Sequence, residues 1–260
     1  MADRPVAWIT GASSGLGSEF ARQLAARGYD LVLIARRRER LEQLARQLSV
    51  HCELIRSDLT LRSEQEILAQ RLSQEPRLAL LVNNAGFGTT RLFWEAELQG
   101  QLAMHELHVM AAVRLTHAAL NNLVRQGQGG IINVASVAAF ARSPANVSYC
   151  ATKAWMLAFS EGLALELRAR KSPVKVQALC PGFTYTEFHD VMGVDRNAVP
   201  RSWWMQAEEV VRASLEGLDR GQVCVIPGWR YRFLVAVLTK LPFALRMILQ
   251  ANSPHTRGRL

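Results

Sequence analysis

The chain has 260 residues, of which 49% are hydrophobic and 20% charged, and its formal net charge is +9. This composition is typical of a folded globular protein and excludes a disordered chain. A membrane-spanning helix is not expected, because no window offers about 18 uncharged apolar residues. The four cysteines are widely spaced and include no C-x-x-C pair. They indicate free thiols in a reducing compartment rather than a disulfide framework or zinc site.

Short apolar runs alternate along the chain with segments of helical periodicity. The runs occupy residues 5–10, 31–35, 79–82, 131–135, 174–179 and 222–228. Each run suits a strand of a parallel sheet, and segments such as SEFARQLAARGY and RERLEQLARQL suit the helices between them. The alternation predicts βαβ units and a doubly wound parallel sheet. Because no linker or internal repeat interrupts this alternation, we expect a single domain.

Three glycines, Gly11, Gly15 and Gly17, follow the first predicted strand in the segment WITGASSGLGSEF. They precede a predicted helix, whose N-terminus offers free N–H groups and partial positive charge. Glycine permits a tight turn and a close backbone approach to a ligand. The spacing G-x-x-x-G-x-G differs from the G-x-G-x-x-G of the common dinucleotide fold. Its position between strand and helix nevertheless favours a pyrophosphate site over a simple turn.

Two arginines follow the second predicted strand in LVLIARRRER, where Arg36 and Arg37 come directly after Ala35. An NAD site usually carries an acid here that binds ribose hydroxyls, but the first acid in this sequence is Glu39. A guanidinium is suited to bind a 2′-phosphate bidentately. The pattern therefore predicts NADP(H). The alternative is a solvated basic helix start paired with Glu39.

Polar residues also follow two of the apolar runs. Asp58 follows one in RSDLT, and Asn83, Asn84 and Gly86 follow 79–82 in LVNNAGFG. All of them could simply cap strand-to-loop turns. Their place at the carboxyl ends of successive strands favours contact with an adenine or a ribose.

A serine, a tyrosine and a lysine follow the run 131–135. Ser136 ends that run, and Tyr149 and Lys153 are four residues apart, which places them on one face of a helix. The Ser136 hydroxyl can hold and polarise a carbonyl oxygen that Tyr149 protonates. Lowering a phenol pKa from ~10 to ~7 requires about 4 kcal/mol. A nearby ammonium supplies about that much, so we expect Lys153 to lower the pKa of Tyr149.

These residues, in this order and spacing, resemble the short-chain dehydrogenases/reductases. TGASSGLG, NNAG, Ser136, Y-x-x-x-K and PGFTYT (181–186) carry the resemblance, which covers about residues 5–228. It implies a Rossmann-like three-layer α/β/α fold and hydride transfer between a nicotinamide cofactor and a carbonyl or alcohol. It further implies that Tyr149 is the general acid/base, that Ser136 orients the substrate oxygen, and that Lys153 binds the nicotinamide ribose.

The resemblance also implies a set of cofactor contacts. It assigns the pyrophosphate side to Gly11, Ser13, Ser14, Gly15 and Leu16, the discrimination for NADP to Arg36 with Arg37, the adenine to Asp58 and Leu59, the adjacent ribose to Asn84 with Ala85 and Gly86, and the carboxamide side to Pro181, Gly182, Thr184 and Thr186.

One position departs from the family pattern. The family usually has an asparagine eight residues before the threonine of its LT pair, where it supports a water-mediated proton relay. In MHELHVMAAVRLTHAAL this position is His108. Histidine can join a relay because its pKa suits proton traffic near neutrality. Alternatively, His108 is a polar filler.

Aromatic residues dominate the segments expected around the substrate. Phe87, Phe140 and Phe183 are the candidate contacts, and Phe188, Trp203 and Trp204 lie in the same segments. They favour a hydrophobic, aromatic or lipid-like carbonyl compound. Most of these aromatics could instead belong to the core or to a dimer interface. Residues 182–215 are predicted to form a lid within a domain of residues 1–228.

Residues 229–260 are predicted to form a basic, aromatic extension packed on that domain, since no acid follows Gly221. The extension could contact an anionic membrane surface or form a subunit interface. No nucleic-acid recognition motif is present. The sequence thus predicts a cytoplasmic NADPH-dependent reductase, a homodimer or homotetramer, that could be peripheral to a membrane. The alternative is a non-catalytic or weakly catalytic NADP-binding protein with a regulatory or membrane-associated role.

Overall fold

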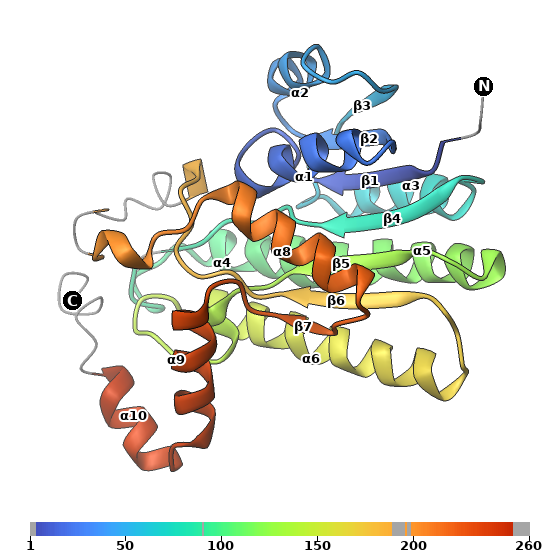
Figure 1. The fold of residues 1–260 in the computed structure, drawn as a ribbon. Coiled ribbons are helices and arrows are strands. Elements are labelled where there is room, and N and C mark those ends of the chain that lie inside the picture. Colours follow the sequence, from blue (N-terminus) through green and yellow to red (C-terminus); the bar gives the residue numbers. More distant parts are fainter. Residues whose placement is uncertain (1–3, 90, 189–195, 197–198, 252–260) are drawn as a thin grey trace.

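The computed structural model describes residues 4–89, 91–188, 196 and 199–251. These residues form a seven-stranded sheet in the order β3-β2-β1-β4-β5-β6-β7, and every pairing is parallel (Figure 1). The strands are β1 (Val6–Thr10), β2 (Asp30–Ala35), β3 (Cys52–Arg56), β4 (Leu78–Asn83), β5 (Gly130–Val134), β6 (Lys175–Leu179) and β7 (Cys224–Val225). Helices cover both faces, which confirms the predicted Rossmann-like three-layer α/β fold.

Five strands lie within one residue of the ranges predicted for them, and β7 is shorter than its predicted range of 222–228. The strand β3 was not among the predicted ranges. It lies at the edge of the sheet, and none of its five residues is buried. It therefore lacks the continuous apolar run that marks strands covered on both faces.

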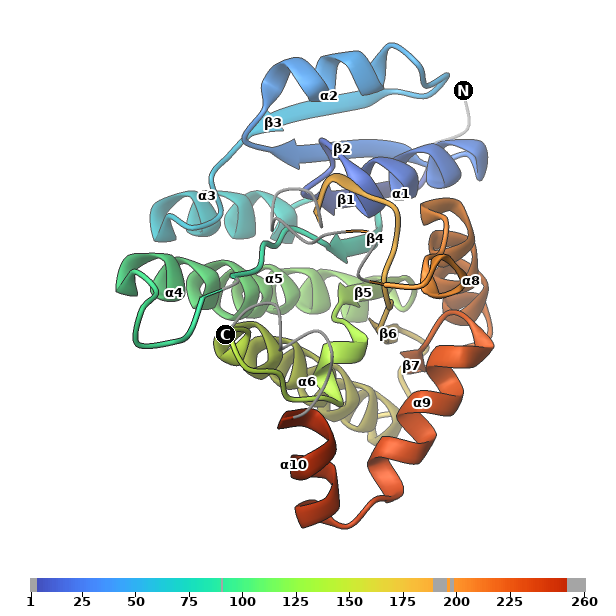
Figure 2. The same cartoon turned by 90° about the vertical axis from the view of Figure 1, so that its left-hand side faces the viewer.

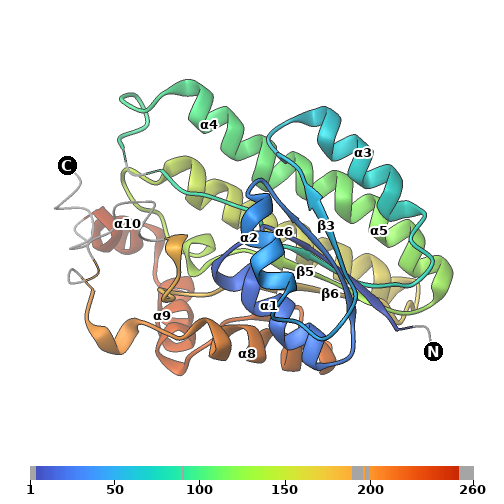
Figure 3. The same ribbon diagram turned by 90° about the horizontal axis from the view of Figure 1, so that it is seen from above.

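The helices divide between the two faces of the sheet. They are α1 (Gly15–Ala26), α2 (Arg38–Ala45), α3 (Arg62–Ser73), α4 (Leu98–His105), α5 (Ala111–Gln126), α6 (Val147–Ala169), α8 (Ala207–Asp219), α9 (Trp229–Lys240) and α10 (Phe243–Ala251). Seen from above, α3 to α6 lie on one side of the sheet and α1 and α8 on the other (Figure 3). The short 3₁₀ helices η2 (Val137–Ala139) and η4 (Arg201–Trp203) lie in connecting segments.

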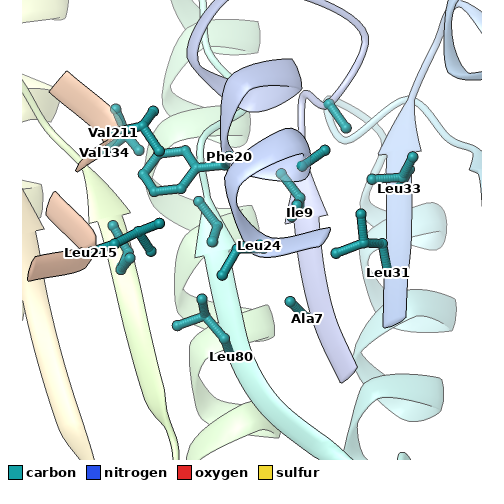
Figure 4. Close-up of a cluster of buried hydrophobic side chains, with 14 of the residues drawn as sticks. Ala7, Ile9, Phe20, Leu24, Leu31, Leu33, Leu80, Val134, Val211 and Leu215 are labelled. Carbon is teal, nitrogen blue, oxygen red and sulfur yellow. The ribbon is translucent and has the colours of Figure 1, made fainter. Parts of the chain in front are cut away.

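Side chains that alternate along each strand build one core layer on each face. On β1, Ala7 and Ile9 pack with α1, while Val6 and Trp8 join the cluster under α3 and α5. Figure 4 shows the first layer, in which Phe20 and Leu24 of α1 meet the strands beside α8. The two layers hold the carboxyl ends of the strands in fixed relative positions.

The chain builds β1, β2 and β3 outward on one side and then crosses over to β4, which lies on the other side of β1. The loops that follow β1 and β4 diverge at this switch point. In open α/β sheets, ligands bind in the crevice formed there. The loops carrying Gly11 and Asn84 are these two loops.

The helices α4 and α5 are joined by a π-helical turn, η1 (Glu106–Met110). The flanking residues His105 and Ala111 keep helical backbone angles, so the three elements form one continuous helix. A π turn inserts an extra residue and redirects the side chains around it. Here the turn includes His108, whose side chain is completely buried.

The structure narrows the predicted lid. Residues 207–215 belong to α8, where Val210, Val211 and Leu215 are part of the core. A lid would thus be confined to residues 182–206, part of which lies outside the described residues. The C-terminal extension forms α9 and α10. Among the residues that the structure describes, no helix is both long and apolar enough to span a bilayer.

Candidate active site

The glycine-rich loop after β1 has backbone geometry that requires glycine. Gly11 and Gly15 have φ angles of +66° and +55°, a region that side chains with a Cβ atom rarely adopt. A Cβ atom on Gly17 would lie 2.2 Å from the Gly11 carbonyl oxygen. At the start of α1, Ser14 makes no side-chain capping bond, and the first turn contains no acid. The helix N-terminus therefore suits an anionic group.

The loop after β4 braces this glycine-rich loop. The Asn84 Nδ2 group donates to the Thr10 and Gly11 carbonyl oxygens at 2.9 and 3.1 Å. The Thr10 hydroxyl accepts from the Asn84 and Ala85 backbone N–H groups at 2.9 and 3.0 Å. Asn84 thus fixes the conformation of the glycine-rich loop, in addition to any contact with a ribose.

Arg37 reaches the glycine-rich loop from the end of β2. Its guanidinium donates to the Ser13 hydroxyl and, at 2.9 Å, to the Ser14 hydroxyl. It also forms a 3.0 Å ion pair with Glu187. Arg36 is exposed beside it. The positive-φ loop, the N-terminus of α1 without a side-chain cap, and the two arginines fit a pyrophosphate with a nearby 2′-phosphate.

The residues predicted for the adenine have local structural partners. The Asp58 carboxylate accepts from the Thr60 backbone N–H at 3.0 Å and from the Thr60 hydroxyl at 2.8 Å. This contact caps the turn after β3. The Leu59 side chain is buried in the core. The second carboxylate oxygen of Asp58 and the backbone of these residues are therefore the groups that remain for a contact with an adenine.

Ser136, Tyr149 and Lys153 meet at the end of β5. Ser136 lies near enough to Tyr149 to lower its pKa, and the Lys153 Nζ atom lies 5.7 Å from the centre of the Tyr149 ring. The Ser136 hydroxyl itself donates to the Pro181 carbonyl oxygen at 3.5 Å. Ser136 ends β5, whereas Tyr149 and Lys153 lie on one face of α6. The Ser136 Oγ atom also accepts from the Ala138 backbone N–H at 3.1 Å. The three residues, which are separated in the sequence, thus form a single cluster.

Burial dominates the electrostatics of the cluster. Burial raises the pKa of Tyr149 to about 12, against a smaller lowering contribution from the nearby Ser136 hydroxyl. Burial lowers the pKa of Lys153 to about 8. The Lys153 Nζ donates to the Val134 carbonyl oxygen at 2.7 Å, so its charge is directed to the backbone. Burial thus outweighs the contributions that lower the pKa of Tyr149, and the predicted effect of Lys153 on it stays a prediction.

His108 is bound at both ring nitrogens. Its Nε2 atom lies 3.2 Å from the Phe87 backbone nitrogen and accepts that N–H. The proton of the neutral ring is therefore on Nδ1, which is 2.9 Å from the Thr152 hydroxyl. Burial lowers the pKa of His108 well below its ordinary value, with further contributions from the Lys153 and His105 charges. Both ring nitrogens are thus engaged within the protein, and the predicted relay stays a prediction.

The Thr152 hydroxyl in turn donates to the Tyr149 carbonyl oxygen at 3.0 Å. Thr152 was not predicted as a site residue. It stands one residue before Lys153 within Y-x-x-x-K, and nothing in the local pattern marks it. Glu187 was missed as well, because its partner Arg37 is 150 residues away.

The candidate substrate aromatics separate into two groups. The Phe87 ring lies 6.1 Å from the His108 ring, and the Phe188 ring lies 5.9 Å from the Tyr149 ring. These two side chains are near the cluster. In contrast, Phe140 packs against a core cluster and Phe183 packs against Trp204, with ring centres 5.4 Å apart. Packing therefore accounts for the positions of Phe140 and Phe183.

The segment Pro181 to Thr186 closes the other side of the site. The Thr184 and Thr186 hydroxyls donate within the segment, to the Gly182 and Thr184 carbonyl oxygens. A Cβ atom on Gly15 would lie 3.1 Å from Thr186, so this segment also abuts the glycine-rich loop. Of the predicted pyrophosphate residues, Leu16 turns its side chain toward the core. Gly86 lies against the His108 ring.

Residues 5–196 match the family model described as short chain dehydrogenase. Nodulation protein G of Rhizobium sp. (strain N33) is 35% identical over 185 residues, which are 71% of this chain and 75% of that protein. A short-chain dehydrogenase from Sphingobium yanoikuyae in complex with NADPH has a TM-score of 0.82 at 35% identity, over 92% of this chain and 97% of that one.

A bulky-bulky ketone specific alcohol dehydrogenase from Comamonas testosteroni has a TM-score of 0.78 at 32% identity, over 92% of this chain and 96% of that one. A short chain dehydrogenase/reductase from Burkholderia phymatum, in complex with NAD, has a TM-score of 0.80 at 25% identity and covers 96% of each chain. The family model, the fold and the Ser136–Tyr149–Lys153 cluster agree: the chain belongs to the short-chain dehydrogenase/reductase family of oxidoreductases.

Proposed function

We propose that the protein is an NADPH-dependent reductase that converts a hydrophobic ketone or aldehyde to the alcohol. The observation that carries this proposal is the cluster of Ser136, Tyr149 and buried Lys153, in which the Lys153 Nζ atom lies 5.7 Å from the centre of the Tyr149 ring. The NADPH-bound and ketone-specific relatives support the choice of cofactor and substrate class. The intact cluster argues against the alternative of a cofactor-binding protein without catalysis.

The cluster is suited to donate a proton to a carbonyl oxygen. Bound NADPH would supply the hydride. The Ser136 hydroxyl orients the carbonyl oxygen, and Tyr149 gives it the proton. A pKa of about 12 keeps Tyr149 protonated at neutral pH, which is the form that reduction requires. Lys153 would hold the nicotinamide ribose, and its charge favours the phenolate left after proton transfer.

The preference for NADP rests on two arginines and a missing acid. Arg36 and Arg37 follow β2, and the helix α2 that begins there has its first acid at Glu39. A 2′-phosphate on this site would replace Glu187 as the anionic partner of Arg37. Because guanidinium is always charged in proteins, the charge of the two arginines at this site should not change with pH.

Assembly as a homodimer or homotetramer in the cytoplasm belongs to the same proposal. Leu98 and Leu102 of α4 are 63% and 51% exposed, and Val124 of α5 is 49% exposed. Apolar residues on adjoining exposed helices are typical of subunit interfaces. Light scattering on Leu98→Lys with Leu102→Lys should show a smaller species than the unmodified chain.

A reductase assay tests the proposal. The unmodified protein is incubated with NADPH or NADH and with aryl, steroid-like or long-chain ketones. We expect NADPH oxidation with at least one hydrophobic ketone, slower turnover with NADH, and loss of the NADPH preference in Arg36→Ala with Arg37→Ala. Equal use of both cofactors by the unmodified protein would contradict the cofactor assignment. No turnover with any ketone or aldehyde would contradict the reaction.

A further inference from the structure

The helices α9 and α10 carry an unusual share of the exposed large hydrophobic residues among those that the structure describes. We call residues 229–251 the C-terminal hairpin. The exposed residues on it are Trp229, Phe233, Val237, Phe243, Leu245, Met247, Ile248 and Leu249. In Figure 2, α9 and α10 lie beyond β7 at the end of the sheet, and Figure 1 agrees. This surface is separate from the cofactor loops after β1 and β4.

The helix α9 presents an apolar stripe to the outside. Trp229, Phe233 and Val237 follow one another at intervals of four residues and are 65%, 68% and 40% exposed. Such spacing places them on one face. Tyr231 and Val235, on the opposite face, are 3% and 6% exposed and hold the helix against the domain. The stripe is therefore an outward face of a helix that is already anchored.

The helix α10 has its polar and apolar sides reversed with respect to a surface helix. Gln250 is its one buried residue, and its Oε1 atom accepts from the Arg142 backbone N–H at 3.0 Å. Arg246, four residues earlier, is half-buried. The exposed positions are mostly apolar, with Phe243 at 69% and Leu249 at 50%. A helix in water normally shows the opposite arrangement.

The charge of this region decides which partner fits. Residues 221–260 contain six Lys or Arg and no Asp or Glu. Arg232 and Lys240 are exposed on α9. The Arg230 guanidinium lies over the Trp229 ring, 5.2 Å from its centre. Cations interleaved with exposed aromatic and aliphatic side chains are the pattern of helices that lie in a lipid interface. A two-fold contact between two copies would instead bring cations against cations.

We propose that the C-terminal hairpin docks on an anionic lipid surface, with the Trp229–Phe233–Val237 stripe and α10 in the interface and the cations at the headgroups. The hairpin is attached at one point to the segment 181–186 of the site and at a second point to the loop after η2. The Tyr231 hydroxyl accepts from the Phe183 backbone N–H at 2.9 Å, and Gln250 binds the loop that contains Arg142. The docked surface therefore lies at the active-site edge of the sheet. This inference is independent of the proposed reaction.

Sedimentation with lipid vesicles tests the proposal on the full chain. One set of vesicles contains phosphatidylcholine alone and the other contains phosphatidylcholine with phosphatidylserine. We expect binding to the anionic vesicles to be at least about tenfold stronger, and to weaken as salt is raised, because each Lys or Arg near an anionic surface adds to the affinity. Binding to neither type of vesicle, or equal binding to both, would overturn the proposal.

Two double variants separate the apolar and electrostatic contributions. Phe233→Ser with Phe243→Ser removes exposed apolar area, and Arg232→Glu with Lys240→Glu reverses two charges. Each should lower binding to anionic vesicles by about tenfold or more. The matched controls are Leu165→Ser, an exposed leucine of α6, and Arg46→Glu, an exposed arginine after α2. The controls should bind like the unmodified chain, and all variants should keep the activity of the unmodified chain toward a water-soluble ketone.

A fluorescence measurement avoids changes to the folded structure. Phosphatidylserine vesicles with brominated acyl chains should quench Trp229, and the quenched component should be missing in Trp229→Phe. Equal quenching in both proteins would contradict insertion of the stripe. A different result would assign the hairpin to an interface between copies. In that case light scattering shows an oligomer for the unmodified chain and a smaller species for Phe233→Ser with Phe243→Ser, and the unmodified chain does not bind vesicles. The proposal then fails.

Discussion

The Nδ1 atom of His108 and the hydroxyl of Thr152 lie 2.9 Å apart, and together they connect the loop after β4 to the helix that carries Tyr149. The connection continues from Thr152 to the Tyr149 carbonyl oxygen and, on the other side, from His108 to the Phe87 N–H. We interpret His108 as a positioning residue that fixes the loop after β4 relative to α6, the helix that carries Tyr149. In this interpretation one ring nitrogen accepts a hydrogen bond and the other donates one.

The first prediction separates this positioning role from a proton relay. His108→Leu should lower kcat by about tenfold or more, because it removes both hydrogen bonds that fix the site. His108→Gln retains a donor and an acceptor and should recover much of the loss. The pH dependence of kcat should have the same shape in the unmodified protein and in His108→Gln. A change of shape between pH 6 and 8, or rescue of His108→Leu by added imidazole, would support a relay instead.

The second prediction concerns stability and pH. The pKa of His108 is well below 6.5 in the folded state, whereas the unfolded chain binds a proton at about 6.5. Because the unfolded state then holds more protons, stability rises with pH in this range and is lost on acidification. Between pH 7.5 and 5.5, the unmodified protein should lose about 1 kcal/mol more than His108→Gln in urea unfolding. Parallel losses in both proteins would contradict the buried neutral ring.

The third prediction concerns Glu187, which pairs with Arg37 and, at 3.5 Å, with Arg40. Glu187→Gln should tighten NADPH binding by about threefold, because a 2′-phosphate no longer competes with this carboxylate. NADH binding should not change. Glu42→Gln is the matched control, since Glu42 pairs with Arg38 at 2.9 Å. Fluorescence titration with each cofactor gives the dissociation constants. Equal effects of Glu187→Gln and Glu42→Gln on NADPH binding would contradict competition between Glu187 and the 2′-phosphate.

The fourth prediction compares two helical glycines. Gly17→Ala would place a Cβ atom 2.2 Å from the Gly11 carbonyl oxygen, so the loop must shift and unfolding should cost about 1–3 kcal/mol less. At Gly162, in the middle of α6, nothing lies within 4 Å of the added Cβ. Gly162→Ala should therefore stabilise the protein by about 0.5–1 kcal/mol. Urea unfolding measures both, and a destabilised Gly162→Ala would show that α6 is more crowded than described.

The sequence was sufficient for the features that depend on local pattern. The runs buried on both faces predicted β1, β2, β4, β5 and β6, and the order of the motifs predicted which residues gather at the carboxyl edge of the sheet. The strand β3 was implied by the run before Asp58 but was given no range, because it is an edge strand with no buried residue. Periodicity reports burial, and a half-exposed strand that contains Glu53 and Arg56 shows little periodicity.

The parts of the site that could not be predicted depend on contacts between distant segments. The role of His108 follows from a π turn and from Thr152, which is 44 residues away. The i, i+4 spacing correctly placed Tyr149 and Lys153 on one face, but it could not show that the lysine ammonium is bound to the Val134 carbonyl. The spacing also could not show that burial, the largest contribution, raises the pKa of Tyr149.

If Tyr149 donates the proton in an NADPH-dependent reduction, as we propose, Tyr149→Phe should remove that proton and with it most of the turnover. The two proteins are compared in NADPH oxidation with an aryl ketone that the unmodified protein reduces, and NADPH affinity is measured separately. We predict a kcat at least about a hundredfold lower, with the NADPH dissociation constant changed by less than about twofold, because the phenol hydroxyl is the only group removed. Turnover by Tyr149→Phe within about tenfold of the unmodified protein would contradict the claim.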